Sequence, residues 1–161
     1  MTRWLSEPEQ RTWRAFLSAT QLLVEELDRE LQHDAGMPHG YYEILVRLSE
    51  SPNQALRMSD LATAAYSSRS RVSHAVSRLE EAGWISREEC PTDRRGQVAV
   101  LTPTGFAALA AAAPGHVEGV RTHLFDQLTP EQVDQLRAIS DAIVGHLVAN
   151  RASHGGACEP V

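Results

Sequence analysis

The sequence predicts a mainly α-helical protein with a small β-hairpin wing, arranged as a winged helix-turn-helix with N- and C-terminal dimerisation helices. Apolar residues recur at steps of three and four over 7–32 and 129–147, which is typical of amphipathic helices. Two short helices flank a tight turn near residue 66, the outline of a helix-turn-helix. Two extended segments, 84–90 and 97–101, enclose a charged turn and predict the hairpin.

Local signals place the ends of the first helices. Ser6-Glu7-Pro8-Glu9 is a capping-box start for the helix over 7–32, and Gly36-Met37-Pro38 ends that pattern. A shorter helix follows and ends at Ser51-Pro52-Asn53. Ser59-Asp60-Leu61-Ala62 predicts a short helix capped by its serine.

The second half of the chain has equally clear boundaries. A helix from about 68 to 82 stops at Gly83, which suits a C-terminal cap. Thr102-Pro103 opens a helix that runs to about residue 125, and Thr129-Pro130 opens the last one. We expect one domain over 1–150, with the winged helix-turn-helix over about 55–101, and a flexible tail over 151–161.

Composition excludes several classes of protein. The chain has 161 residues with a net charge of −6, and all 15 basic residues are arginine, so lysine-dependent phosphate loops and Schiff bases are excluded. The sequence also lacks hydrolase, zinc-protease and dinucleotide-binding motifs, and we expect neither an enzyme nor a cofactor. With two cysteines, no apolar run of membrane-spanning length and no signal core, we expect a cytoplasmic protein without a membrane partner.

The helix over 68–81 presents small polar and cationic side chains on the side away from its apolar stripe. At 100° per residue, Ser70, His74 and Ser77 point away from the core, and the charge between residues 67 and 79 is +3 with no acid. Small hydroxyls let a helix enter a major groove, and arginines reach guanine edges or phosphates. The same composition also occurs on ordinary solvated helix faces.

The hairpin that follows favours DNA as the partner. Arg94 and Arg95 at its tip could enter an adjacent minor groove, where negative potential is concentrated. Asp93 would repel phosphate, so we expect it to support the wing by holding an arginine. The expected contacts with double-stranded DNA are Ser68, Arg69, Ser70, Arg71, Ser73, His74, Arg78, Arg94 and Arg95.

In this region the sequence resembles the multiple-antibiotic-resistance-regulator (MarR) family. The resemblance extends over about residues 8–150, and its motifs are specific in combination, order and spacing. The Asp93-Arg94-Arg95 wing matches the family's D-x-R pattern, and Leu101-Thr102-Pro103-Thr104-Gly105 matches L-T-x-x-G. The remaining matching stretches are Ser59-Asp60-Leu61-Ala62, Ser68-Arg69-Ser70-Arg71-Val72-Ser73-His74 and Arg78-Leu79-Glu80-Glu81-Ala82-Gly83-Trp84-Ile85.

The resemblance implies a transcriptional regulator that binds a palindromic operator as a homodimer, most often as a repressor. Its two recognition helices should lie about 34 Å apart, one turn of DNA. The sequence supports a dimer independently, because residues 7–32 and 117–148 hold more apolar surface than a small winged domain can cover. We expect the dimerisation helices over about 7–32 and 103–150. The expected interface residues are Leu23, Leu27, Val120, Leu124, Leu136, Ile139, Ile143 and Leu147.

The resemblance also implies a small aromatic or phenolic effector, bound between the dimerisation helices and the winged domain. Aromatic walls with a few polar groups would suit such a ligand, although each of these residues could equally belong to core or interface. The candidates are Trp13, Phe16, His39, Tyr42 and His116.

Other interpretations remain open at this point. Cys90 at the base of the hairpin could sense electrophiles with Arg87 nearby, but Glu88 and Glu89 oppose a lowered thiol pKa. A metal-responsive regulator is a further alternative, but the seven histidines form no tight ligand pair, so we expect no metal site. A winged adaptor that does not bind DNA would not need the Arg94-Arg95 tip.

Overall fold

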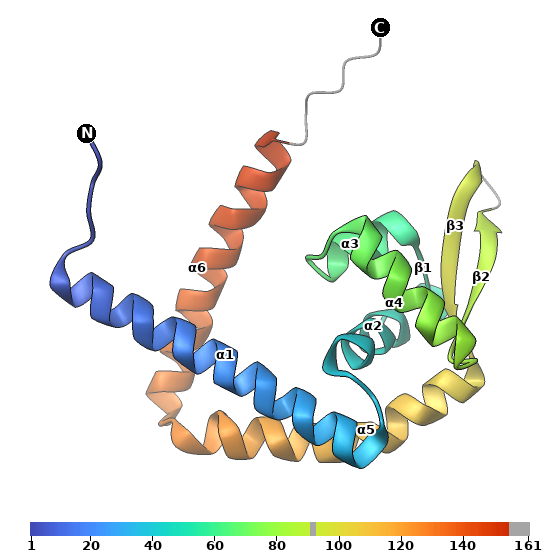
Figure 1. Ribbon diagram of the computed structural model, residues 1–161, viewed down its shortest axis with the longest axis horizontal. Helices are drawn as coiled ribbons and strands as arrows, with labels where there is room; N and C mark the ends of the chain where they lie inside the picture. The colour runs from blue at the N-terminus through green and yellow to red at the C-terminus, as the bar shows by residue number, and fades with distance from the viewer. Residues whose placement is uncertain (91–92, 155–161) are drawn as a thin grey trace, which may run out of the picture. The chain divides into compact units, whose positions relative to one another are not determined.

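A computed structural model describes the backbone of residues 1–90 and 93–154 and the side chains of residues 1–90 and 96–150. Helices dominate, and a small antiparallel sheet completes the fold, which confirms the predicted fold class (Figure 1). The helices are α1 (Glu7–Ala35), α2 (His39–Ser49), α3 (Met58–Ala64), α4 (Arg69–Glu81), α5 (Pro103–His123) and α6 (Pro130–His154), with short 3-10 turns at Pro52–Gln54 and Phe125–Gln127. The strands are β1 (Ala55–Arg57), β2 (Ile85–Cys90) and β3 (Asp93–Leu101).

The chain divides into two compact units, residues 1–119 and the residues from 120 onward, with the boundary inside α5. The first unit contains the winged helix-turn-helix and α1, and the second contains α6. The single domain over 1–150 stays a prediction. Among the helices within residues 1–90 and 93–154, none has both the length and the apolar character needed to span a membrane.

Capping boxes start both long terminal helices, and the sequence predicts the first of them, at Ser6. The Ser6 amide donates to Glu9 Oε2 at 2.7 Å, and the Glu9 amide donates back to Ser6 Oγ at 3.4 Å. Thr129 and Gln132 make the same exchange before α6. α1 ends three residues later than predicted, where Gly36 adopts a left-handed conformation with φ of 62°.

The C-terminal helix is also longer than expected. α6 continues to His154, so its backbone includes the first four residues of the predicted flexible tail. Residues 155–161, the rest of that tail, lie outside the described residues.

The sheet contains a strand that the sequence did not predict. Its order is β1-β3-β2, and β1 pairs antiparallel with Val98–Val100 of β3. Three residues are too few for an alternating pattern to be recognised. α3 begins at Met58, immediately after Arg57 of this strand. Ser59 therefore lies inside the helix, and the predicted cap at Ser59 is wrong. The Ser59 hydroxyl instead donates to Asp60 Oδ1 at 3.1 Å.

The core of the first unit holds the helix-turn-helix against α2 and the sheet. Leu45, Leu48, Leu61, Val76 and Leu79 are completely buried and belong to one cluster. Burial of such a side chain stabilises the fold by about 1.5–3 kcal/mol. The apolar stripe of α4 therefore fixes which side of that helix remains outside.

Thr102 joins the base of the wing to the helices on either side of it. Its hydroxyl donates to the Gly83 carbonyl at 2.7 Å and accepts from the Gly105 amide at 3.0 Å. Its own amide donates to the Trp84 carbonyl at 3.1 Å. The end of α4, the end of the hairpin and the start of α5 thus meet in one hydrogen-bonded junction, which we call the Thr102 junction.

Candidate nucleic-acid interface

The outer side of α4 is formed as the helical wheel predicts, with one exception. Val72, Val76 and Leu79 face the core, each no more than 2% exposed. Ser77, which the wheel places on the outer side, is only partly exposed because it contacts the sheet. The other predicted DNA contacts on this element all lie at exposed positions: Ser68, Arg69, Ser70, Arg71, Ser73, His74 and Arg78.

The N-terminus of α4 combines a cap with positive charge. Ser68 Oγ accepts from the Arg71 amide at 3.3 Å, and the first turn holds no acidic residue. Partial positive charge at a helix N-terminus attracts phosphate, and the side chains of Arg69 and Arg71 add to it. This end of the helix therefore suits a nucleic-acid backbone.

The turn before α4 depends on an unusual backbone conformation. Tyr66 has φ of 48°, in the left-handed region that favours glycine, and its side chain is 55% exposed. The Ser67 amide donates to the Ala62 carbonyl at 3.0 Å and closes the turn. Sequence analysis did not select Tyr66, although an aromatic residue in a tight turn is the signal that could have identified it.

Arg78 differs from the other arginines of α4. Its Nη1 donates to Glu81 Oε2 at 2.8 Å, and both side chains are more than half exposed. Since the ion pair is solvated, it contributes little to stability, and another anion can replace Glu81 as the partner of Arg78. A DNA contact by Arg78 would require this exchange.

The wing is an antiparallel hairpin with an irregular outer end. β2 and β3 pair from Ile85↔Leu101 to Glu89↔Gln97, and the register shifts between Glu89 and Cys90. The side chains of Asp93, Arg94 and Arg95 lie outside the described residues, so their roles stay predictions.

Arg87 connects the wing to α4. Its Nη2 donates to the Ser73 carbonyl at 3.0 Å and to Ser77 Oγ at 2.6 Å, while its Nε lies 3.4 Å from Glu80 Oε2. From the sequence alone, Arg87 is recognisable only as a neighbour of Cys90. An arginine in a strand gives no sign of which helix it contacts, so this role required the fold.

The predicted effector residues form two separate groups. His116 of α5 lies against two residues of α2, with ring centroids 5.4 Å from His39 and 4.4 Å from Tyr42. Trp13 and Phe16 stack on each other instead, 6.3 Å apart, and are 51% and 43% exposed.

The distance between these groups follows from the helix that separates them. The amide of His39 donates to Asp28 Oδ1 of α1 at 2.7 Å. Phe16 precedes Asp28 by twelve residues on the same helix, or about 18 Å. One ligand of ordinary size could not contact both groups within a single chain.

The imidazole of His116 lies in an environment that disfavours its charged form. Its Nδ1 is buried without a hydrogen-bond partner among the described residues. Burial first, and the neighbouring His39 second, hold the pKa of His116 below its usual range, although Glu43 and Glu30 oppose this shift. The imidazole is therefore neutral near pH 7.

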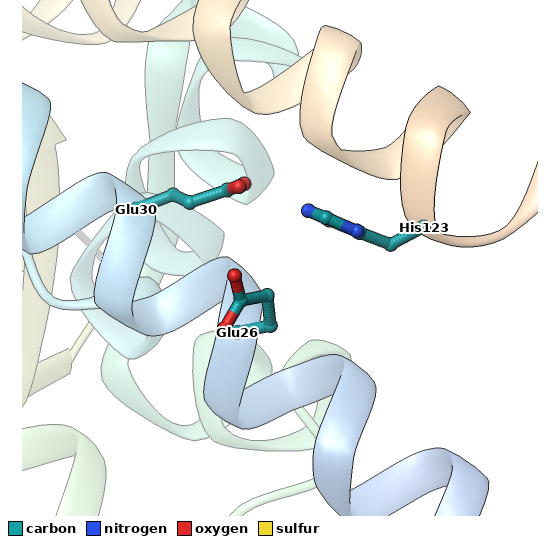
Figure 2. A group of neighbouring side chains, drawn as sticks. All are labelled: Glu26, Glu30 and His123. Atoms are coloured by element: carbon teal, nitrogen blue, oxygen red, sulfur yellow. The ribbon is translucent and has the colours of Figure 1, made fainter.

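A small pocket of about 70 Å³ lies beside His116 and is lined by α1 and α5. Its polar lining includes the carboxylates of Glu30 and Asp34. Glu30 and Glu26 project from the same side of α1, one turn apart (Figure 2). A Cβ at position 119 would lie 2.4 Å from Glu30 Oε2, so Gly119 permits this approach of α1 to α5.

Cys90 is 5% exposed at the end of β2. Reaction of a thiol with an electrophile in solution requires access to the sulfur as well as a thiolate. Burial thus makes Cys90 a poor sensor while the sheet remains folded.

Much of the predicted dimer interface is accessible in the single chain. Ile139, Ile143 and Leu147 are 55%, 41% and 52% exposed along α6. Leu27 differs, because it is only 6% exposed and lies where α1 approaches Gly119. The remaining predicted interface residues, Leu23, Val120, Leu124 and Leu136, are partly buried.

Comparison with known proteins gives one consistent result. Residues 38–96 match the MarR family. The chain is 53% identical to Sco3205, a MarR family transcriptional regulator from Streptomyces coelicolor solved in complex with DNA, with a TM-score of 0.88 over 91% of this chain and 92% of that one. It is 45% identical to AbsC, a MarR family regulator from the same organism, with a TM-score of 0.86 over 92% and 99% of the two chains.

More distant relatives are also regulators. The chain is 33% identical over 97 residues to PecS, an HTH-type transcriptional regulator of Dickeya dadantii, a match that covers 60% of this chain and 58% of PecS. It is 29% identical over 112 residues to the transcriptional repressor MprA of Escherichia coli, covering 70% and 63%. The chain thus spans less than two thirds of either protein. It belongs to the MarR family of transcriptional regulators, and the expectation that it is not an enzyme is confirmed.

Proposed function

We propose that this protein is a homodimeric, DNA-binding repressor that places α4 in the major groove of a palindromic operator. The observation that carries the proposal is the exposed N-terminal half of α4, where Arg69 and Arg71 flank a serine-capped N-terminus and the first turn holds no acidic residue. The small side chain of Ser70 leaves room for close approach to base edges, which the imidazole of His74 could contact. The structure of Sco3205 in complex with DNA supports the same partner.

A dimer is proposed from the accessible apolar residues of α6. Ile139, Ile143 and Leu147 recur every four residues and form one stripe on that helix. Removal of such a stripe from water favours association by about 25 cal/mol per Å² of apolar surface. A two-fold axis would then present two copies of α4 to successive major grooves.

We propose that a small effector releases the protein from DNA through the cluster of His39, Tyr42 and His116. The carboxylates of Glu30 and Asp34 line the adjacent pocket and would repel a carboxylate ligand, so the charges favour a phenol or a cationic aromatic compound. Such a ligand would favour a spacing of the two α4 helices that does not match the grooves.

The DNA-binding proposal is tested by measuring the affinity for DNA from the protein's own upstream region at several salt concentrations, with nonspecific competitor. We expect tight binding that survives competitor and weakens steeply with salt. Arg71→Ala should weaken binding and reduce the salt slope by about one. Arg137→Ala is the matched control, because Arg137 is an exposed, ion-paired arginine on α6.

The alternative is an adaptor that keeps the winged fold without reading DNA. Binding that is weak, displaced by competitor and equal in the Arg71 and Arg137 variants would favour it. Equal affinity for the upstream DNA and a scrambled duplex would also contradict a sequence-specific regulator.

A further inference from the structure

Arg87 is an arginine of the wing whose hydrogen bonds are directed into the protein. Its side chain is 20% exposed, far less than the 56% of Arg78. Both N–H bonds of its Nη2 are in use, one to the Ser73 carbonyl and one to Ser77 Oγ. Two of the five N–H bonds of this guanidinium are therefore used within the protein, and its low exposure makes it less accessible to a phosphate than Arg78.

The three contacts of Arg87 follow one stripe of α4. Ser73, Ser77 and Glu80 lie at steps of four and three, on the same side of that helix over two turns. The Ser77 hydroxyl donates to the Ser73 carbonyl at 3.0 Å, so its lone pairs face Arg87. A backbone carbonyl and a hydroxyl thus accept hydrogen bonds from one planar group, and a carboxylate forms an ion pair with it, an arrangement that arginine suits and lysine does not.

The contacts join two elements that would otherwise be held mainly by apolar packing. Arg87 is fixed in β2 opposite Ala99 of β3, so its position is that of the sheet. Rotation of α4 by one residue about its axis would turn its outer side by 100° and break these contacts. They therefore add a polar constraint to the rotation of α4, beside the apolar packing of Val72, Val76 and Leu79.

We propose that Arg87 is a positioning residue for DNA recognition, which fixes the rotation of α4 relative to the wing without contacting DNA. The proposal rests on the DNA-binding function proposed above. It assigns Ser77 to the same network and removes it from the DNA-facing side on which the helical wheel placed it.

The test compares four variants for operator affinity, salt slope and specificity over a scrambled duplex. Arg87→Met should weaken operator binding at least tenfold, while the salt slope and the affinity for scrambled DNA stay at the wild-type values. Arg87→Lys should bind the operator more tightly than Arg87→Met but more weakly than wild type, because a single ammonium group cannot replace the planar guanidinium. Ser77→Ala should weaken binding several-fold, and adding it to Arg87→Met should cost nothing further.

Two results would overturn the proposal. A salt slope that falls by about one in Arg87→Met would identify Arg87 as a direct phosphate contact. Additive losses for Arg87→Met and Ser77→Ala would show that the two residues act independently.

A measurement without DNA separates this proposal from the DNA-binding function itself. In the free protein, the Nη2 protons of Arg87 should exchange slowly with solvent in NMR spectra, and Ser77→Ala should accelerate that exchange. If the wild-type protein binds no operator but shows this protection, the contact network stands and the proposed function fails. Fast exchange in the wild-type protein would refute the network.

Discussion

Gly105 offers the sharpest test of the packing at the Thr102 junction. It lies in the first turn of α5, where helix propensity alone predicts that alanine would stabilise the protein by up to about 1 kcal/mol. A Cβ at this position, however, would lie 2.0 Å from the Trp84 carbonyl oxygen and 2.8 Å from its carbon. These are backbone atoms, so no side-chain rotation can relieve the contact.

The steric cost of the added Cβ is larger than the gain in helix propensity. Forcing one extra carbon into a packed site costs about 1–3 kcal/mol. Displacing the Trp84 carbonyl also weakens the bond that it accepts from the Thr102 amide, worth about 1 kcal/mol. After the gain in propensity, Gly105→Ala should lose about 1–3 kcal/mol, which lowers Tm by about 2–12 °C for a chain of this length.

Gly115 provides the matched control on the same helix. The nearest atom to a Cβ there is Asp34 Oδ2 at 4.0 Å, so Gly115→Ala should be neutral or raise Tm by a few degrees. Thermal unfolding is measured for wild type and both variants at one protomer concentration, because association shifts Tm. Equal or higher stability of Gly105→Ala would refute the assigned contact.

Three further predictions address the interface, the wing and the pH dependence. Aspartate at Leu136 and Ile143 together should abolish the dimer and operator binding, measured by sedimentation and gel shift; an intact dimer would contradict the interface. Arg95→Ala should weaken DNA binding at least several-fold with the dimer intact, and loss of the dimer would mean that the wing is wrongly assigned. Because the pKa of His116 is lowered on folding, its contribution to stability is complete above about pH 6.5 and is lost as pH falls below that value through the folded-state pKa. His116→Phe should reduce the dependence of the urea midpoint on pH below about pH 6.5. An unchanged dependence would show that other groups cause it.

Local signals in the sequence were sufficient where structure depends on neighbouring residues. The serine at position 68 and the glycine at 83 bracket α4 correctly, because a cap and a left-handed residue act within one helical turn. The capping box at Ser6 and the helix start at Thr129-Pro130 were equally reliable. Periodicity also identified which side of α4 is buried.

What could not be predicted depends on residues far apart in the chain. β1 exists because Ala55–Arg57 pairs with a segment more than forty residues later, and its presence moved the start of α3. The helical wheel could not show that Arg87 occupies the side of α4 where Ser77 lies. The resemblance likewise grouped Trp13 with His116, although Trp13 stacks on Phe16 of α1 and His116 packs against α2.

The Thr102 junction determines how displacement passes between elements. A hinge requires backbone groups that can change partners at little cost, whereas here two carbonyls and two amides are committed to a single residue. Bending between α5 and the wing would break several of these bonds together. A displacement of the start of α5 is therefore transmitted to the C-terminal end of α4 without bending at this junction. Any flexibility between these elements must come from another part of the chain.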